Sequence, residues 1–127
     1  MKSVPITPYA LGLLALALAP AFAQPPPSVA RGHELFNTWC LGCHRATVVD
    51  NDNPRSLVNR VVAGTYTLQL RYHGTKPAAL EQRTDLRPAY IEYVVRHGLN
   101  VMPRTRKTEL TDAELEDVVA YLTRNNH

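Results

Sequence analysis

The chain is poor in cysteine. Its 127 residues include only two, Cys40 and Cys43, which stand three positions apart. Small secreted domains often depend on several disulfides, but this chain could form at most one, and so short a ring constrains little of the chain. The second pair of cysteines that a structural zinc site usually needs is absent. We therefore expect some other source of stability.

The chain also lacks a strong net charge. Fourteen Lys and Arg residues face eleven Asp and Glu residues, a formal charge of +3, which does not indicate a nucleic-acid partner. The charges are unevenly spread, since residues 76–107 hold seven basic and three acidic residues and residues 108–127 hold one and five. This distribution is compatible with a basic docking surface and equally with ordinary solvated charge.

No apolar run is long enough to span a bilayer. The run from Ala10 to Ala19 falls short of the roughly 20 residues that a transmembrane helix needs. It follows a positive start at Lys2 and precedes Ala21-Phe22-Ala23, the small-x-small pattern of a signal peptidase site. These features predict a cleaved export signal at residues 1–23, with an uncleaved membrane anchor as the alternative.

The segment after the predicted signal is rich in proline. Three consecutive prolines between Gln24 and Ser28 favour an extended spacer. We therefore expect a signal at 1–23, a Pro-rich linker at 24–28 and one domain at 29–127, in a protein exported to an oxidising compartment such as a bacterial periplasm.

Helix patterns stand at both ends of the predicted domain. Ser28 is a suitable N-cap for a helix that continues to His44. Gly32 on its apolar face indicates close approach of another helix, unless the helix begins only after it. Near the end of the chain, Thr111 and Glu114 form a capping box, and an apolar stripe follows at helical spacing: Leu115, Val118, Val119 and Leu122.

The middle of the chain is less regular. Turn-forming residues fill 50–54, and residues 55–64 favour a short helix with Gly64 near its end. The stretch 65–74 alternates partly and is ambiguous between strand and loop. Residues 87–98 predict a helix that begins at a proline and stops at a glycine, and residues 99–110 predict a non-helical segment.

The two cysteines belong to one unit, Cys40-Leu41-Gly42-Cys43-His44. On a helix, positions i, i+3 and i+4 share a face, so both thiols and the imidazole can reach one object. This spacing is the c-type haem attachment signal: the thiols add to the two vinyl groups, and the histidine reaches the iron. A bound haem would also supply the missing stabiliser.

Other interpretations of this unit are weaker. A thioredoxin-like pair needs a strand–helix–strand context, which the surrounding helix patterns do not provide. A simple disulfide between Cys40 and Cys43 gives no role to His44.

Met102 is the candidate for the second iron ligand. It is the single methionine left after removal of Met1, and it precedes Pro103 in the predicted non-helical segment. Ligation by histidine and methionine raises the reduction potential and closes the iron to substrates. An ordinary core methionine is the alternative. For the other imidazole nitrogen of His44 we expect a backbone carbonyl as acceptor, with Pro54 as the candidate.

Together these motifs resemble class I c-type cytochromes with one haem, over about Val29 to Leu122. The matching elements are "CLGCH", "VMP", the Gly32–Phe36 pattern of the first helix, and "LEDVVAYL" of the last helix. The resemblance implies an all-α, small cytochrome c fold of four to five helices around one covalently attached haem, with the N- and C-terminal helices crossing near Gly32 and Tyr121.

A narrower resemblance covers "YVVRHGLNVMPRTRKTELTDAELEDVVAYL". It is similar to the cytochrome subunits of p-cresol methylhydroxylase-type flavocytochromes, in which a flavoprotein oxidises alkylphenols and passes electrons to the cytochrome. The sequence departs from that pattern at Arg87 and Thr105.

The expected function is that of a periplasmic single-electron carrier rather than an enzyme. Haem c is the expected cofactor, with Cys40 and Cys43 as thioether positions and His44 and Met102 as axial iron ligands. The expected partners are a dehydrogenase, with a flavoprotein as the narrower candidate, and a downstream electron acceptor. The basic stretch Arg104–Lys107 would steer an acidic partner. The alternative is a haem enzyme or ligand sensor with an open iron site.

Overall fold

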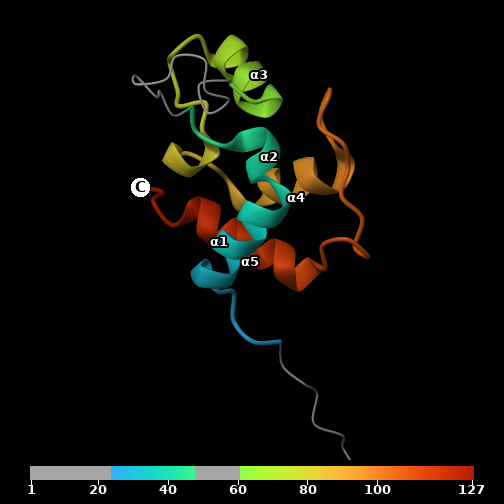
Figure 1. Ribbon diagram of the computed structural model, residues 1–127. Coiled ribbons are helices and arrows are strands. Elements are labelled where there is room, and N and C mark those ends of the chain that lie inside the picture. Colours follow the sequence, from blue (N-terminus) through green and yellow to red (C-terminus); the bar gives the residue numbers. More distant parts are fainter. Residues whose placement is uncertain (1–23, 48–60) are drawn as a thin grey trace, which may run out of the picture.

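The computed structural model describes residues 24–47 and 61–127, and within these ranges the chain is helical without strands. The elements are α1 (Val29–Trp39), α2 (Leu41–His44), α3 (Ala63–Tyr72), the 3₁₀ helix η2 (Leu80–Gln82), α4 (Pro88–His97) and α5 (Asp112–Thr123). In Figure 1, α1 and α5 cross, α2 continues from α1, and α3 lies beyond α2. The predicted all-α fold with crossing terminal helices is confirmed. The predicted signal at 1–23 lies outside the described residues.

None of the helices in the described ranges is both long and apolar enough to cross a membrane. Residues 24–28 are non-helical, and Ser28 caps α1 by accepting a hydrogen bond from the Arg31 backbone N–H at 3.3 Å.

The crossing of α1 and α5 depends on Gly32. A Cβ atom at Gly32 would lie 1.9 Å from the carbonyl oxygen of Asp117 and 2.8 Å from Cβ of Tyr121. No side chain larger than hydrogen fits at this distance, so the two backbones meet directly. The predicted close approach is confirmed, and α1 starts before Gly32, not after it.

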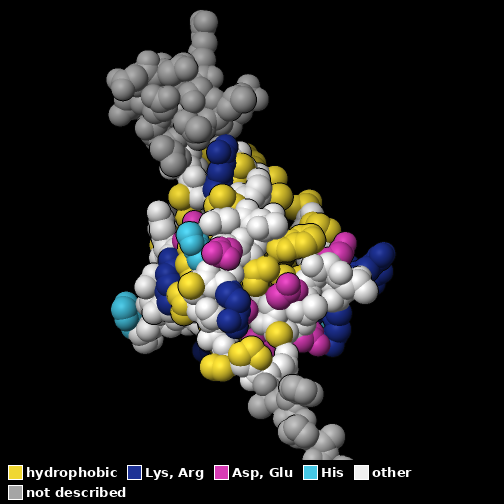
Figure 2. All heavy atoms as spheres, turned by 60° about the horizontal axis from the view of Figure 1, so that its bottom comes forward, with side chains coloured by type: hydrophobic (Ala, Val, Ile, Leu, Met, Phe, Trp, Pro, Cys, Tyr) yellow, Lys and Arg dark blue, Asp and Glu magenta, His cyan; other side chains and the backbone are white. Residues whose placement is uncertain are grey.

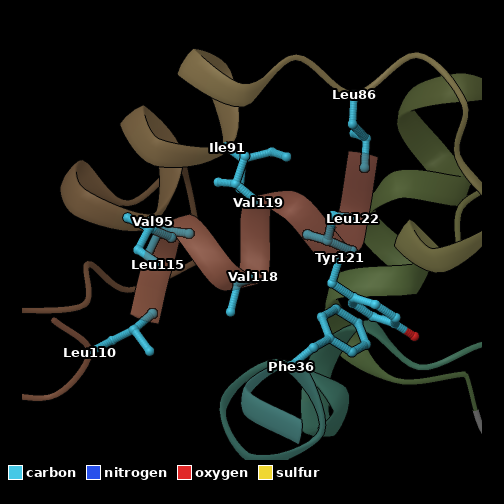
Figure 3. Packing of buried hydrophobic residues seen from close by; sticks show 10 residues of the cluster. All are labelled: Phe36, Leu86, Ile91, Val95, Leu110, Leu115, Val118, Val119, Tyr121 and Leu122. Carbon is cyan, nitrogen blue, oxygen red and sulfur yellow. The ribbon is translucent and has the colours of Figure 1, made fainter. Parts of the chain in front are cut away.

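The hydrophobic core lies between α1, α4 and α5 (Figure 3). Phe36 of α1 is fully buried, and its ring centre lies 5.7 Å from that of Tyr121. Both halves of the predicted capping box are present at Thr111 and Glu114. The buried residues of α4 and α5 that complete the core are Ile91, Val95, Leu115, Val118, Val119 and Leu122.

One buried charge connects the start of α1 to α5. The Asp117 side chain is 5% exposed and pairs with the Arg31 guanidinium, whose Nε donates to Oδ2 at 2.9 Å. Its Oδ1 also accepts from the backbone N–H of Ser28. Hydrogen bonding to Arg31 holds the pKa of this carboxyl below its usual value. The ion pair therefore fixes the point where the Pro-rich stretch meets the domain.

Helix α3 differs from the sequence expectation. Residues 65–72 are helical, so neither the strand nor the loop interpretation was right, and Gly64 is the second residue of the helix instead of lying near its end. The alternating β-branched and aromatic residues suggested a strand. Thr65 is the one residue of α3 that is buried, whereas Tyr66 and Leu70 are 53% and 54% exposed. This helix therefore has no continuous apolar stripe to reveal its period.

Polar contacts hold the segment that follows α3. Arg83 is 4% exposed and forms an ion pair with Asp85, and its guanidinium carbon lies 4.6 Å from the centre of the Tyr72 ring. Lys76 also pairs with Asp85. These contacts attach residues 73–87 to the end of α3.

The last residues of the chain hold the same segment from the other side. The Tyr121 hydroxyl donates to the carboxylate of Glu81, the middle residue of η2. Beyond α5, the side-chain amide of Asn126 donates to the backbone carbonyl of Leu86 at 2.5 Å.

Candidate haem-binding site

The cysteine unit occupies the junction of α1 and α2. Cys40 ends α1 and precedes α2, since its N–H donates to the Phe36 carbonyl at 2.8 Å while its own carbonyl accepts from Cys43 and His44 at 3.0 and 2.9 Å. The predicted single helix is thus two helices that meet at Cys40. The turn from Cys40 to His44 remains helical, which keeps the two thiols and the imidazole on one turn, as the motif requires.

Both thiols are free. Cys43 is exposed, and Cys40 is partly buried. Burial, together with the neighbouring Cys43, raises the pKa of the Cys40 thiol to about 11. The two sulfur atoms form no disulfide in this structure. Because its pKa lies well above 7, the Cys40 thiol is neutral at pH 7.

The His44 ring is largely buried. Burial lowers its pKa, which favours the neutral imidazole, and a neutral imidazole is the form that binds a metal. Its Nδ1 atom is buried and has no hydrogen-bond partner within the described residues. The predicted acceptor, Pro54, lies outside the described residues. An unpaired buried nitrogen of this kind is costly, and an iron-bound imidazole would donate from this nitrogen to an acceptor.

Met102 lies in the segment between α4 and α5, which is non-helical as predicted. Leu99 and Met102 exchange two backbone hydrogen bonds, of 3.1 and 2.9 Å, to form a tight turn. Gly98 makes this turn possible because its φ is +77° and a Cβ atom there would lie 2.6 Å from the Met102 carbonyl oxygen. Sequence reasoning assigned Gly98 only the end of a helix, whereas the structure makes it the residue that positions Met102.

Arg96 anchors the Met102 segment to both flanking helices. Its guanidinium donates to the Thr105 carbonyl at 3.2 Å and to the Asp112 carboxylate at 3.0 Å. In addition, the Thr105 N–H donates to the Val95 carbonyl at 2.7 Å. Sequence reasoning did not identify Arg96; a basic residue in the last turn of a helix was the available signal, and it also has a simpler explanation in the helix dipole.

The candidate site residues come from two distant segments. Cys40, Cys43 and His44 share one turn, and Met102 follows 58 positions after His44. Cys40 and Met102 both pack, partly buried, against the same core cluster. The residues present fit a covalently held haem: two unlinked thiols, a neutral imidazole with an unpaired nitrogen, and a thioether on a constrained turn.

The competing histidines have other roles. His97 donates to the Tyr93 carbonyl at 2.9 Å and stacks on the Tyr93 ring at 4.4 Å between centres. His33 is exposed and accepts from the Asn37 side chain. In the described part of the chain, no group of three or more His, Cys, Asp and Glu side chains could hold a metal ion.

Comparison with known proteins gave a family match. The family model described as "Cytochrome C oxidase, cbb3-type, subunit III" matches residues 27–122. This range contains the whole cysteine unit and the Met102 turn. No curated protein and no solved structure matched the chain.

Proposed function

Because the chain belongs to the cytochrome c family described as cbb3-type oxidase subunit III, and so carries covalently bound haem c, we propose that it is a periplasmic single-electron carrier. The observation that supports this most strongly is the helical turn from Cys40 to His44, which presents two free thiols beside a neutral imidazole. Bound haem c supplies an iron that accepts and returns one electron.

Four residues have defined roles in this proposal. Cys40 and Cys43 would each add a sulfur and its hydrogen across one vinyl group, so no atom is lost. His44 and Met102 would hold the iron. An iron held by both side chains would have no position left for a substrate, which favours electron transfer over catalysis.

Replacement of Met102 tests the assignment. We expect wild-type ferric protein to show the weak methionine–iron band at the red end of the spectrum, and Met102→Ala to lose it and become high-spin and ligand-binding. Leu99→Ala is the matched control because Leu99 belongs to the same turn and is 37% exposed. A Met102→Ala spectrum identical to wild type would show that Met102 is not the ligand. A wild-type spectrum that is already high-spin would favour the alternative function, an enzyme or sensor with an open iron site.

Export is the second part of the proposal. It is supported by the signal-like sequence at 1–23. The intact mass of protein purified from a periplasmic extract tests it. We expect the mass of residues 24–127 plus one haem, and full-length haem-free protein would contradict it.

The partner is proposed to be acidic where it meets the Met102 segment. Arg104 and Arg106 are exposed, and within the described residues neither side chain forms an ion pair, whereas Lys107 pairs with Asp112 at 2.6 Å. On the face shown in Figure 2, basic and acidic side chains are intermixed. Electrostatic steering would therefore depend on neighbouring positive charges such as Arg104 and Arg106. It would act mainly on the association rate.

Ionic strength tests this steering. We expect the rate of electron exchange with an acidic partner to fall as salt rises, and the slope to flatten in the double variant Arg104→Gln/Arg106→Gln. Lys107→Gln is the comparison variant: it removes one positive charge instead of two, so the slope should flatten by less. A rate that is insensitive to salt would remove the steering proposal and leave the haem assignment intact.

A dehydrogenase is the proposed electron donor, and a flavoprotein acting on alkylphenols is the narrower candidate. The support for it is the resemblance over residues 93–122. The family that matches is instead described as an oxidase subunit, and an oxidase is accordingly the candidate for the electron acceptor. Mixing the cytochrome with each enzyme and its substrate distinguishes the two roles, because a donor reduces the haem and an acceptor oxidises it.

A further inference from the structure

We infer that the first turn of α3 positions the imidazole of His44, with Gly64 and Thr65 as the positioning residues. This inference rests on the proposed ligation of iron by His44. It assigns a role to a helix that is otherwise poorly buried.

Gly64 lies directly against the histidine. A Cβ atom at this position would lie 2.5 Å from the carbonyl oxygen of Cys43, 2.8 Å from Cε1 of His44 and 2.9 Å from Nδ1 of His44. All three distances are shorter than any van der Waals contact of carbon. The α3 backbone therefore covers the edge of the ring that carries the unpaired Nδ1 atom.

Thr65 fixes α3 in this position. It is 2% exposed, and its hydroxyl donates to the backbone carbonyl of Arg45, the residue after His44, at 2.8 Å. Since Thr65 is the one residue of α3 that is buried, burial of apolar side chains does not explain why the helix approaches here. Both contacts with the segment that contains His44 come from the first turn of α3.

Bound haem would make the contact of Gly64 with Cys43 and His44 more rigid. Cys43 would be tethered through its side chain and His44 through its ring, so neither could move away from a methyl group at position 64. The imidazole would have to rotate, or α3 would have to retreat and admit water to Nδ1. Ring orientation and the hydrogen bonding of Nδ1 both tune a histidine ligand.

The Gly64→Ala variant tests the inference. We expect the g values of the ferric haem in electron paramagnetic resonance to shift and the midpoint potential to fall, because water at Nδ1 makes the imidazole a stronger donor to ferric iron. One glycine control separates this effect from loss of stability. Gly32→Ala adds a methyl group at the α1–α5 crossing and should keep wild-type g values and potential.

A second variant decides the case in which Gly64→Ala fails to retain haem. Thr65→Val removes the hydroxyl that holds Arg45 while keeping the shape of the side chain, and should shift the g values in the same direction by less. Its control is Thr67→Val, because in the described part of the chain the Thr67 hydroxyl donates to the Ala63 carbonyl of the same helix, at 2.9 Å.

The inference is overturned if Gly64→Ala loses stability as Gly32→Ala does but keeps wild-type g values and potential. It is equally overturned if Gly64→Ala holds no haem and Thr65→Val matches Thr67→Val. Failure of the proposed function would look different, because wild-type protein itself would then lack the low-spin spectrum of a histidine-ligated haem.

Discussion

Two glycines, Gly32 in α1 and Gly64 in α3, permit close approach in two different regions of the molecule. At the α1–α5 crossing, Gly32 meets the backbone of Asp117, and Phe36 and Tyr121 close the core beside it. At the α2–α3 contact, Gly64 meets the ring of His44 with little apolar burial around it.

The difference shows that a glycine inside a helix has no single meaning. At the crossing it serves stability, because the helices on both sides bury their apolar faces there. At the α2–α3 contact the neighbour is a candidate iron ligand, so the same absence of a side chain serves the site. Changes at the crossing should therefore alter the free energy of unfolding and leave the haem unaffected.

Phe36→Ala should have the largest effect. Phe36 is 0% exposed, and loss of a fully buried aromatic ring costs about 3–5 kcal/mol. Denaturant unfolding of the ferric protein measures the loss, with Val29→Ala, at a 46% exposed position of the same helix, as the control. If Phe36→Ala shifted the midpoint potential as much as Gly64→Ala does, the proposed difference between the α1–α5 crossing and the α2–α3 contact would be wrong.

Gly32→Ala should come next. The added Cβ would collide with the Asp117 carbonyl at 1.9 Å, and overpacking of this kind costs about 1–3 kcal/mol. The helices must separate to relieve it, so the denaturation midpoint should fall. Wild-type stability in this variant would show that the crossing tolerates separation without cost.

Asp117→Asn should cost less, about 1–2 kcal/mol at neutral pH, since a charged acceptor for Arg31 is lost. The pKa of Asp117 is lowered in the folded state. Its contribution is therefore complete above the ordinary carboxyl pKa of 3.8 and disappears as the pH falls through the lower folded-state value. Unfolding curves of wild type and Asp117→Asn should converge in acid, and a constant difference would refute the charge as the cause.

Thr111→Ala should have the smallest effect. It removes the side chain that caps α5, which accepts from the Glu114 N–H at 3.3 Å, and such a loss costs about 1 kcal/mol. Because Thr111 caps α5, one of the two crossing helices, and not the α2–α3 contact, the thermal unfolding midpoint should fall slightly. The g values should stay as in wild type. Thr108→Ala, at an exposed position outside any helix, is the control.

The helices that bury a continuous face were predictable from the sequence. Gly32 and Phe36 in α1 and the capped stripe of α5 follow the 3.6-residue period, so their packing was visible as a pattern. Helix α3 buries only Thr65 and its composition favours a strand, so no pattern could reveal it.

The candidate site divides in the same way. Local spacing identified Cys40, Cys43 and His44 as one unit, because one helical turn brings them together. The role of Gly64 depends on a contact across 20 positions, and no local pattern encodes such a contact. Gly98 was recognised as a helix stop, but its contact with the Met102 carbonyl requires the folded turn.

The hydrogen bond from Asn126 to the Leu86 carbonyl has a practical consequence for purification. An affinity tag joined directly after His127 would disturb Asn126, whose hydrogen bond holds the residues just before α4 in place. A flexible Gly/Ser spacer before the tag would leave this hydrogen bond intact in the recombinant cytochrome.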